Sequence, residues 1–452
     1  MRKIIQYMMM ALIAVVLASC ANDISEESTP TVKSNIRFVV DDFPMFEKPS
    51  TRTIGEEDKG KTAWAVGDEI CVKLESKELG TQTATLKYNG VKFEIQDGNS
   101  LCYLDGEPVT AYAYYAPNRK WRNGSLDFKD IYGNPNGTAE FLEATCTVHY
   151  GDDNYVDISF ANATRNYSRL RIATIPKTEI KVDADNFAPT DNPNLLYMTY
   201  TLTSDEKGNA YLYGTFDNNS IVTVKYRGAS LATHKFSKKT ENAKSYVLDA
   251  TVISANSAEE IYSAIKQEIA DGKTAIRLNL ASDAGDNEFN AIREAFENVQ
   301  DATIDLTLIG CKEIPVNGLY RIMALKSITL PDVTKIRMDA LSSCLYLQEI
   351  CAPNVSAIDE YAFGKCRYLR KVTLGKLTDV RGEANSRSGI FDDINDLNPD
   401  IDLYLPKNQE VMKGEFDENS IWKPTGEKYF ASPDYDNGIF LGYQFHSVKS
   451  WE

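Results

Sequence analysis

The sequence predicts a multidomain, mostly β protein in which an all-β N-terminal half precedes a short repeat solenoid with a helical cap. Short alternating apolar runs, bounded by Gly, Asn, Asp and Pro, fill residues 34–255 and predict strands. An internal repeat of constant period begins near residue 304 and predicts stacked coils. A capping box at Ser257 lies between the two patterns and predicts a helix at their junction.

The first nineteen residues are typical of an export signal. Arg2 and Lys3 precede a largely apolar run over residues 4–17. As a helix this run would span about 21 Å, which is shorter than the roughly 30 Å hydrocarbon core of a bilayer. Its length therefore favours a signal peptide over residues 1–19 rather than a transmembrane helix.

The signal ends in Leu17-Ala18-Ser19-Cys20, which resembles the lipobox of bacterial lipoproteins. The resemblance implies cleavage before Cys20 and attachment of acyl chains such as palmitate to that cysteine. Several acyl chains, at about 0.8 kcal/mol per buried methylene, anchor a protein stably to a membrane. An ordinary secretory signal with an incidental cysteine is the alternative.

Residues 20–33 are polar, acidic and poor in aliphatic side chains, which predicts a flexible tether between the lipid and the first domain. Asp23, Glu26 and Glu27 resemble the acidic patch that directs some lipoproteins to the outer face of the outer membrane, although acidic tethers also serve solvation. We expect a lipid-anchored outer-membrane protein that is exposed at the cell surface.

The charge of the chain excludes two classes of partner. The 452 residues carry a formal net charge of −16, and loss of Arg2 and Lys3 with the signal makes it −18. Such a chain is unsuited to neutralising nucleic-acid phosphates or to holding anionic lipid through a polybasic patch. At about 150 residues per domain, the length predicts two or three domains.

The N-terminal half reads as all-β. Runs such as residues 36–40, 70–74 and 221–224 alternate or are rich in β-branched side chains, and no long helical period interrupts them. Two packed sheets are the simplest way to bury such strands. We expect a first β-sandwich over residues 34–150 and a second over residues 151–255.

Several segments of this half resemble the fimbrillin family of surface lipoproteins. They are Thr51-Arg52-Thr53, Trp64-Ala65-Val66-Gly67-Asp68-Glu69-Ile70, Phe160-Ala161-Asn162-Ala163, Ser168-Arg169-Leu170-Arg171-Ile172 and Lys244-Ser245-Tyr246-Val247-Leu248. The resemblance implies two transthyretin-like β-sandwiches and a role as fimbrial subunit, anchor or tip adhesin. Asn162 replaces the usual histidine of one family motif, so the resemblance implies no particular subunit role.

The second half changes period. Ser257 and Glu260 form a capping box, and Gly272 marks the end of the helix that follows. A second helix is expected near residues 290–299, and the two helices together are expected to cap a solenoid over residues 256–428. The aromatic tail over residues 429–452 is expected to close the other end. Its members, with one upstream tryptophan, are Trp422, Tyr429, Phe430, Tyr435, Phe440, Tyr443 and Phe445.

The repeat is defined by three equally spaced segments. They are residues 325–331, 347–353 and 369–375. The next strand, near Leu405, comes later than this period requires, so the polar stretch before it contains an insertion. Ala362-Phe363-Gly364-Lys365-Cys366 resembles the BspA-like leucine-rich repeats of bacterial surface proteins. Coils stacked about 4.8 Å apart would bury one continuous apolar stripe.

Two ladders of residues are predicted to face out from this stack. Inward side chains at positions 306, 328, 350 and 372 leave their neighbours on the opposite face. The outward residues are Asp305, Thr307, Ser327, Thr329, Glu349, Cys351, Lys371 and Thr373. A solenoid sheet is a preformed binding surface, so these residues are candidates for ligand contact; the alternative is that they are simply the hydrated side of the strands.

No catalytic or metal-binding motif is present. The three histidines, His149, His234 and His446, lie in unrelated contexts, and we expect no enzyme activity, cofactor or metal site. Acidic clusters could bind calcium loosely or could be solvated loop charge. They are Asp152, Asp153 and Asp157; Asp283, Asp286 and Glu288; Asp392, Asp393 and Asp396; and Asp434 and Asp436. Besides Cys20, seven scattered cysteines are expected to be mostly small buried residues rather than a disulfide framework.

These features predict a surface lipoprotein that presents a leucine-rich-repeat module for adhesion or ligand binding. The membrane, through Cys20, and an unknown protein or glycan would be its partners. One alternative, which the resemblance to fimbrillins implies, is a fimbrial subunit that polymerises by strand exchange after cleavage at Arg52, with other fimbrial subunits as partners. A further alternative is a glycan-binding lipoprotein of a nutrient-uptake system, with Trp422 or Tyr435 contacting the sugar.

Overall fold

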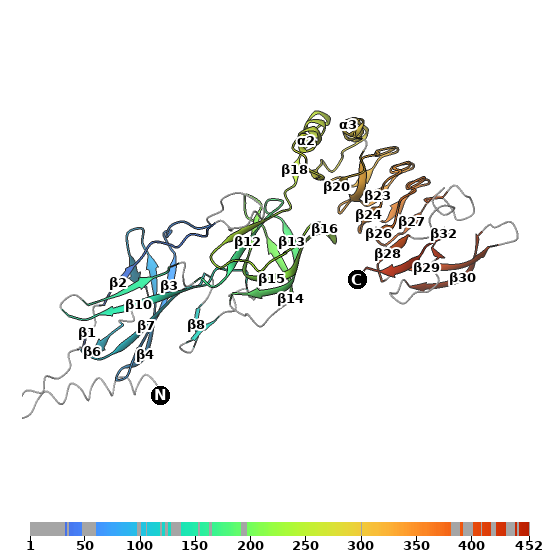
Figure 1. The fold of residues 1–452 in the computed structure, drawn as a ribbon. Coiled ribbons are helices and arrows are strands. Elements are labelled where there is room, and N and C mark those ends of the chain that lie inside the picture. Colours follow the sequence, from blue (N-terminus) through green and yellow to red (C-terminus); the bar gives the residue numbers. More distant parts are fainter. Residues whose placement is uncertain are drawn as a thin grey trace, which may run out of the picture. The chain divides into compact units, whose positions relative to one another are not determined.

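The computed structural model of the chain is mostly β (Figure 1). The residues that it describes are 32–33, 36–47, 60–96, 101–104, 106–117, 120–122, 125–127, 137–151, 154–161, 165–190, 197–299, 301–380, 389–391, 401–407, 409–416, 422–430, 439–440 and 443–451. Within these ranges there are two helices, and several β-sheets account for the other regular structure. Neither helix has the length and apolar character needed to cross a membrane.

The first sheet has seven strands in the order β2-β11-β10-β7-β3-β4-β5. Their bounds are β2 (Arg37–Val40), β3 (Glu69–Ser76), β4 (Gly80–Tyr88), β5 (Phe93–Ile95), β7 (Val109–Tyr115), β10 (Leu142–His149) and β11 (Tyr155–Ser159). β2 pairs with β11 in parallel, whereas β10 and β11 form an antiparallel hairpin. Ile70, Val72 and Leu74 alternate along β3 and are fully buried, as the period of a strand requires.

Two small ladders accompany this sheet in the sequence. They are β1 (Val32–Lys33) with β6 (Tyr103–Leu104), and β8 (Lys120–Arg122) with β9 (Ser125–Asp127). The last two residues of the segment expected to be a flexible tether, Val32 and Lys33, are therefore paired as a strand.

The second sheet follows in the chain and has the order β14-β13-β15-β12-β17, with β16 also paired to β15. Its strands are β12 (Ser168–Ala173), β13 (Glu179–Pro189), β14 (Tyr197–Thr203), β15 (Asn209–Tyr226), β16 (Ala229–Lys235) and β17 (Ser245–Asp249). β15 pairs with β12 through residues 209–214, with β13 through residues 214–216 and 221–225, and with β16 through residues 221–226. One strand thus serves two sets of neighbours around a buried core that includes Phe187 and Phe216.

The chain forms two compact units, and their limits differ from the linear boundary expected at residues 150/151. One unit comprises the described residues of Met1–Asp41, Ala65–Ala113 and Ala144–Ser159; the other comprises those of Asp42–Trp64, Tyr114–Glu143 and Phe160–Glu452. The expected boundary falls inside the β10–β11 hairpin, whose strands share one sheet. Aromatic packing explains why an early segment joins the later unit, since Phe43 and Phe46 are buried against Tyr115 and Tyr167.

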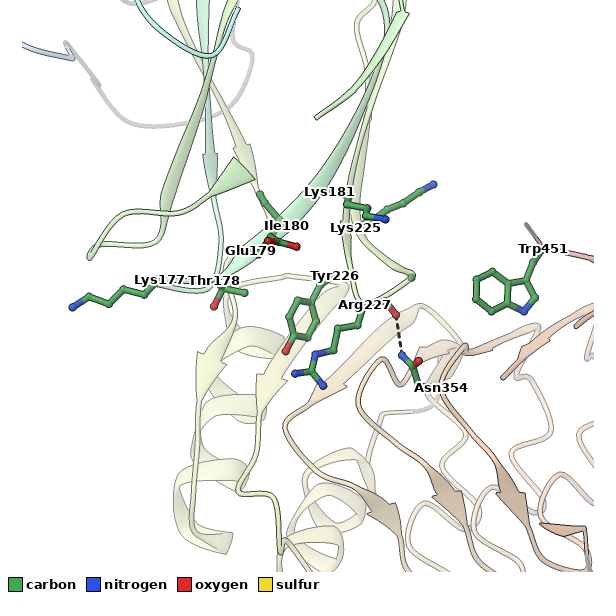
Figure 2. A pocket seen from close by; sticks show the side chains of 11 residues that line it. Lys177, Thr178, Glu179, Ile180, Lys181, Lys225, Tyr226, Arg227, Asn354 and Trp451 are labelled. Atoms are coloured by element: carbon green, nitrogen blue, oxygen red, sulfur yellow. Dashed lines mark hydrogen bonds between the residues drawn. The ribbon is translucent and has the colours of Figure 1, made fainter. Parts of the chain in front are cut away.

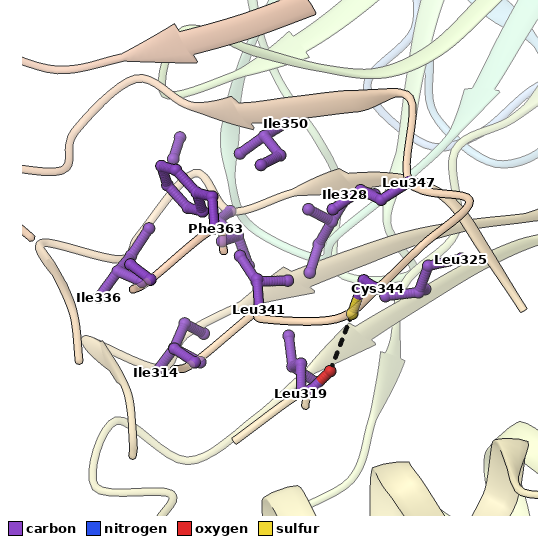
Figure 3. Close-up of a cluster of buried hydrophobic side chains, with 14 of the residues drawn as sticks. Ile314, Leu319, Leu325, Ile328, Ile336, Leu341, Cys344, Leu347, Ile350 and Phe363 are labelled. Carbon is purple, nitrogen blue, oxygen red and sulfur yellow. Dashed lines mark hydrogen bonds between the residues drawn. The ribbon is translucent and has the colours of Figure 1, made fainter. Parts of the chain in front are cut away.

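The repeat region is built on a parallel sheet of eight strands in the order β18-β19-β20-β22-β24-β26-β28-β33. Their bounds are β18 (Ile253–Ser254), β19 (Ala275–Asn279), β20 (Ile304–Ile309), β22 (Leu325–Thr329), β24 (Glu349–Ala352), β26 (Lys371–Leu374), β28 (Asp402–Leu405) and β33 (Ser447–Ser450). A second parallel ladder comprises β21 (Glu313–Ile314), β23 (Lys335–Ile336), β25 (Ala357–Ile358) and β27 (Asp379–Val380). The two ladders enclose one continuous hydrophobic core, part of which is drawn in Figure 3.

Residues that are one sequence period apart lie side by side on successive coils. Ile328, Ile350 and Val372 are direct partners on successive strands, and all three are fully buried. Backbone hydrogen bonds repeat with the same period, because the Leu319 N–H donates to the carbonyl of Ala340 and the Leu341 N–H donates to that of Ala362. Coil therefore stacks on coil through both the core and the backbone.

Each coil also contains two non-glycine residues in the left-handed backbone region. One set is Asn317, Asp339 and Tyr361, with φ of 57°, 55° and 55°; the other is Arg321, Ser343 and Lys365, with φ of 60°, 62° and 61°. Both sets recur with the period of the repeat, so the same pair of turns is rebuilt in each coil. Such positions cost conformational energy unless the surrounding structure holds them.

Both expected helices are present, with one shifted. α2 (Ala258–Ala270) begins at Ser257, whose hydroxyl accepts the Glu260 N–H at 3.3 Å, while the Glu260 carboxylate accepts the N–H of Asn256 rather than that of Ser257. α3 (Asp286–Phe296) begins earlier than the expected start near residue 290. The reason is that Glu288 caps it by accepting the Gly285 N–H at 2.9 Å, so part of the acidic cluster at residues 283–288 is a helix N-terminus.

The C-terminal part extends the stack. β33 pairs with β28 and becomes the last strand of the parallel sheet. Phe391 packs edge to face against Phe445 and Tyr443, with ring centroids 5.2 and 5.5 Å apart, and Phe445 is buried in the repeat core. Two hairpins lie in the same region: β29 (Glu410–Phe416) with β30 (Trp422–Phe430), and β31 (Ile439–Phe440) with β32 (Tyr443–Gln444).

Several predicted residues lie outside the described part of the chain. They are Cys20 with its signal, Arg52, Asn162, Tyr435 and the acidic residues Asp152, Asp153, Asp392, Asp393, Asp396, Asp434 and Asp436. Trp422 lies on the described strand β30.

Candidate ligand-binding face and the adjoining pocket

The residues predicted to face outward do lie opposite the buried core. Along β20, β22, β24 and β26 they pair in register, strand to strand, as two ladders. The first ladder is Asp305, Ser327, Glu349 and Lys371, and the second is Thr307, Thr329, Cys351 and Thr373. We call this surface, together with its continuation on β28 and β33 (Asp402, Tyr404, Ser447 and Lys449), the outer face.

One end of the outer face is covered by the second β-sheet. Thr307 is only 6% exposed, and β16 contacts β22. The Arg277 side chain, on the strand before Thr307, donates from Nε to the backbone carbonyl of Leu231 at 2.8 Å. The coils near β20 are therefore less accessible to a ligand than those near β26, β28 and β33.

Polar side chains on the outer face pair with each other between coils. The Ser327 hydroxyl donates to Asp305 at 2.6 Å, and the Lys371 ammonium lies 2.6 Å from the Glu349 carboxylate. Partial burial opposes ionisation of Lys371, but the hydrogen bond to Glu349 and the charge of that carboxylate, with smaller contributions from Cys351 and Tyr404, together raise the pKa of the lysine. The Lys371–Glu349 pair neutralises two of the charges on this face, whereas Asp305 is hydrogen-bonded to a neutral hydroxyl.

The continuation of the outer face contains an aromatic residue that the sequence prediction missed. Tyr404 lies opposite Thr373, and its ring is flanked by the ammonium groups of Lys371 and Lys449, 5.8 and 5.7 Å from the ring centroid. The sequence did contain a signal for it. The apolar pattern returns at Leu405 after the insertion, and a strand there places its neighbour Tyr404 in the ladder after Thr373. Tyrosine between two cations is a chemistry suited to binding interfaces.

Asp402 organises the polar end of this face. Its carboxylate accepts hydrogen bonds from His446 at 3.0 Å, from Lys449 at 3.3 Å and from Ser447. Partial burial tends to raise the pKa of Asp402. The three donors together outweigh this effect and lower the pKa below its ordinary value. The three donors all come from β33 or the residue before it, so Asp402 helps to hold that strand on the sheet.

The cysteines of the repeat divide as predicted between core and outer face. Cys344 and Cys366 are fully buried, and their thiols donate to the carbonyls of Leu319 and Leu341 at 3.1 and 3.2 Å, the first shown in Figure 3. Burial raises the pKa of Cys344 to about 12. Cys351 is half-buried on the outer face, and burial, with the Glu349 charge, raises its pKa to about 11. All seven described cysteines are free thiols.

The tip of the β15–β16 hairpin is held against the repeat by a buried carboxylate. Asp332 is 3% exposed at its side chain; it lies 2.7 Å from the Arg227 guanidinium and accepts the Gly310 N–H at 3.0 Å. Asn354 donates from Nδ2 to the carbonyls of Arg227 and Pro331, at 3.0 and 2.8 Å. The second β-sheet and the repeat are therefore joined by more than the linker near residue 255.

A pocket of about 900 Å³ lies beside this contact (Figure 2). Its lining comes from the start of β13, from the hairpin tip, and from the repeat. The residues are Lys177, Thr178, Glu179, Ile180, Lys181, Lys225, Tyr226, Arg227, Gly228, Asn354 and Trp451. Four of them are cationic and one is anionic, in a chain whose net charge is −16.

The histidines are not gathered into a site. His149 stacks on Tyr155 with centroids 4.1 Å apart, His234 lies on β16, and His446 is beside Asp402. Among the described residues, no group of three or more His, Cys, Asp or Glu side chains is arranged to hold a metal ion.

Comparison with known proteins identifies the repeat. Residues 291–393 match the BspA type leucine rich repeat region, in six copies. A mutant of the shaft pilin spaA from Lactobacillus rhamnosus GG is a structural neighbour, at 14% identity, over 49% of this chain and 98% of the pilin, with a TM-score of 0.18; a score this low does not establish a shared fold. No curated protein matches the chain. The C-terminal half thus contains a region similar to BspA-type leucine-rich repeats.

Proposed function

We propose that the chain is a cell-surface lipoprotein that presents a leucine-rich-repeat solenoid for adhesion or ligand binding, without enzyme activity. Its lipid would be attached at Cys20 and would hold it in the outer membrane. Two fimbrillin-like, transthyretin-type β-sandwiches would lie between the lipid and the solenoid. The match of residues 291–393 to BspA-type repeats supports the binding module.

The observation that carries this proposal is the outer face around Tyr404. The residues there are fixed on a sheet, so binding requires little ordering of the backbone. Tyr404 offers an amphipathic ring between Lys371 and Lys449, and the pairs around it leave hydrogen-bonding groups at the surface. A protein or glycan ligand can use both the ring and the polar groups.

An array of proteins and glycans tests the proposal with a lipid-free chain that begins at Ala21. We expect at least one ligand whose binding is weakened about tenfold or more by Tyr404→Ala, the range typical of a buried aromatic anchor. The charge-reversed pair Glu349→Lys with Lys371→Glu should weaken it as well. Tyr346→Ala, at an exposed tyrosine outside the outer face, is the matched control and should bind normally. Equal binding by all variants would contradict the proposed face.

The lipid anchor has its own test. Cys20→Ser should abolish metabolic labelling with palmitate and leave an unprocessed or released protein, because the thiol is the only proposed acceptor. Labelling that survives this substitution would contradict the anchor while leaving the binding face untouched.

The second candidate function is a fimbrial subunit that polymerises by strand exchange. Two features of the segment before Arg52 favour it. This segment supplies β2 at the edge of the first sheet and the buried side chains of Phe43 and Phe46. Cleavage after Arg52 would remove all three and uncover an edge strand and apolar pockets, which invite a replacement strand.

Mature protein that begins at Thr53 and runs in high-mass filaments would support this second candidate. The Arg52→Ala variant provides the control, since it should remain monomeric and keep its first residues. Filaments formed equally well by Arg52→Ala would contradict the cleavage mechanism.

A further inference from the structure

We propose that the pocket beside the β15–β16 hairpin binds an anionic saccharide that carries carboxylate or sulfate groups. This site is distinct from the Tyr404 surface, so either can fail without the other.

The cations form one wall of the pocket. Lys181 and Lys225 are direct partners on adjacent strands, and Figure 2 shows both extending toward the side on which Trp451 lies. Three of the four cations are paired with carboxylates: Lys225 with Asp183 at 2.6 Å, Lys177 with Glu206 at 2.9 Å and Arg227 with Asp332 at 2.7 Å. Lys181 is exposed and forms no salt bridge among the described residues. The exposed Lys181 ammonium, next to Lys225 on the adjacent strand, therefore remains available to attract an anion. Ammonium groups bind carboxylate and sulfate through charge-assisted hydrogen bonds.

The aromatic wall is fixed in place. The Trp451 indole N–H donates to the Leu374 carbonyl at 2.9 Å, and a Cβ built on Gly228 would lie 3.8 Å from the indole ring. The ring is therefore held between the repeat and the hairpin tip and is only half-buried. A flat ring with one exposed side packs against the apolar face of a pyranose, and its N–H is already satisfied.

The walls are preformed because the hairpin is fastened to the repeat. The Arg227–Asp332 ion pair and the hydrogen bond from Asn354 to the Arg227 carbonyl fix the base of the pocket. A volume of about 900 Å³ is within the range of small-ligand sites, roughly 300–1,000 Å³. Asn354 and Thr178 add neutral hydrogen-bonding groups that suit sugar hydroxyls.

The chemistry favours a saccharide over a nucleic acid. A phosphate polymer would extend beyond the pocket onto an acidic surface and be repelled. A short saccharide concentrates one or two charges near Lys181 and Lys225 and offers a ring to Trp451. Two sources share this chemistry: sulfated glycans of an animal host and carboxylated polysaccharides of bacterial or plant origin.

Calorimetric titration of the chain beginning at Ala21 tests the proposal with four probes. They are a heparin-derived tetrasaccharide, a tetragalacturonate, and a neutral counterpart of each, made from the first by desulfation, N-acetylation and carboxyl reduction and from the second by carboxyl reduction. We expect one charged probe to bind, its neutral counterpart not to bind, and the affinity to fall as salt rises. Whichever charged probe binds identifies the source. Absence of binding by both charged probes at millimolar concentration would overturn the proposal.

Variants locate the site. The pair Lys181→Gln and Lys225→Gln should weaken binding about tenfold or more, since two charge-assisted contacts are lost. Trp451→Ala should weaken it, and Trp451→Phe should restore most of the loss, which distinguishes stacking from misfolding. The matched control is Lys235→Gln with Lys238→Gln, exposed lysines outside the pocket, which should bind normally. Equal loss in the control pair, or loss in Tyr404→Ala alone, would overturn the pocket as the site.

Discussion

Tyr404 lies directly opposite Thr373 in the parallel sheet, although the two are farther apart in the sequence than one regular period of the repeat. β28 pairs in register with β26 despite the additional residues between them in the sequence. The outer face therefore continues past the last regular repeat. Around Tyr404 it offers a ligand both an aromatic ring and charged side chains.

The reactivity of Cys351 should report its place on the outer face. We expect maleimide to modify Cys351 before Cys344 and Cys366, which are fully buried in the core of the repeat. Because the pKa of Cys351 is raised to about 11, its thiolate fraction and labelling rate should rise about tenfold per pH unit between pH 7 and 9. Peptide mapping by mass spectrometry measures the rates. Faster labelling of Cys344 than of Cys351 would mean that the strand faces are exchanged.

The core positions of the repeat should dominate its stability. Ile350→Ala removes a fully buried side chain between two coils and should lower the free energy of unfolding by about 2–5 kcal/mol. Lys326→Ala, at an exposed position in the adjacent coil, should change it by about 0.5 kcal/mol or less. Chemical denaturation of both variants provides the comparison. Similar effects of the two substitutions would contradict the buried register.

The left-handed turns of the coils predict an unusual response to glycine. Lys365 has a φ of 61°, so Lys365→Gly should leave stability unchanged or raise it by up to about 1 kcal/mol. Lys365→Val should lower it, because a β-branched side chain is strained there. Lys376→Gly, at an exposed position outside the left-handed set, should lower stability by about 0.5–1 kcal/mol. Thermal unfolding measures all three, and a loss in Lys365→Gly would contradict the assigned turn.

The ion pair between Asp332 and Arg227 should hold the hairpin tip on the repeat. Asp332→Asn keeps an acceptor for the Gly310 N–H but removes the charge that faces Arg227. We expect amide hydrogen exchange to become several-fold faster across the tip of the β15–β16 hairpin, since opening loses its main restraint. Lys312→Ala, which removes a more distant cation 3.6 Å from the same carboxylate, is the control and should exchange as the wild type does. Unchanged exchange in Asp332→Asn would show that the pair does not restrain the hairpin.

The repeat register could be predicted from the sequence because apolar residues recur at a constant spacing along the chain. Ile328, Ile350 and Val372 recur at a fixed spacing, and stacked coils can bury them in only one way. The start of the second helix was misplaced because the acidic residues around Glu288 were interpreted as a cluster rather than as a helix N-terminus. The repeat register and the start of the second helix both depend on residues that are close together in the sequence or one period apart.

Contacts between distant segments could not be predicted in this way. No local pattern indicates that Asp332 meets Arg227, or that Phe43 and Phe46 pack with the later unit. The pocket lined by Lys181 and Trp451 lies beside the contact between Arg227 and Asp332 and is built from three separate parts of the chain. The strand register of the ladder follows from the period, but its coverage near Thr307 depends on distant packing.

The most direct test of the central claim is the adhesion of bacterial cells that display the full-length chain, compared with cells that display Tyr404→Ala at equal surface level. Attachment to a surface coated with the ligand found on the array is measured under flow. The proposed function predicts that Tyr404→Ala cells detach at clearly lower shear, while cells with the control substitution Tyr346→Ala attach as the wild type does. Equal attachment by all three would contradict adhesion through the outer face of the repeat.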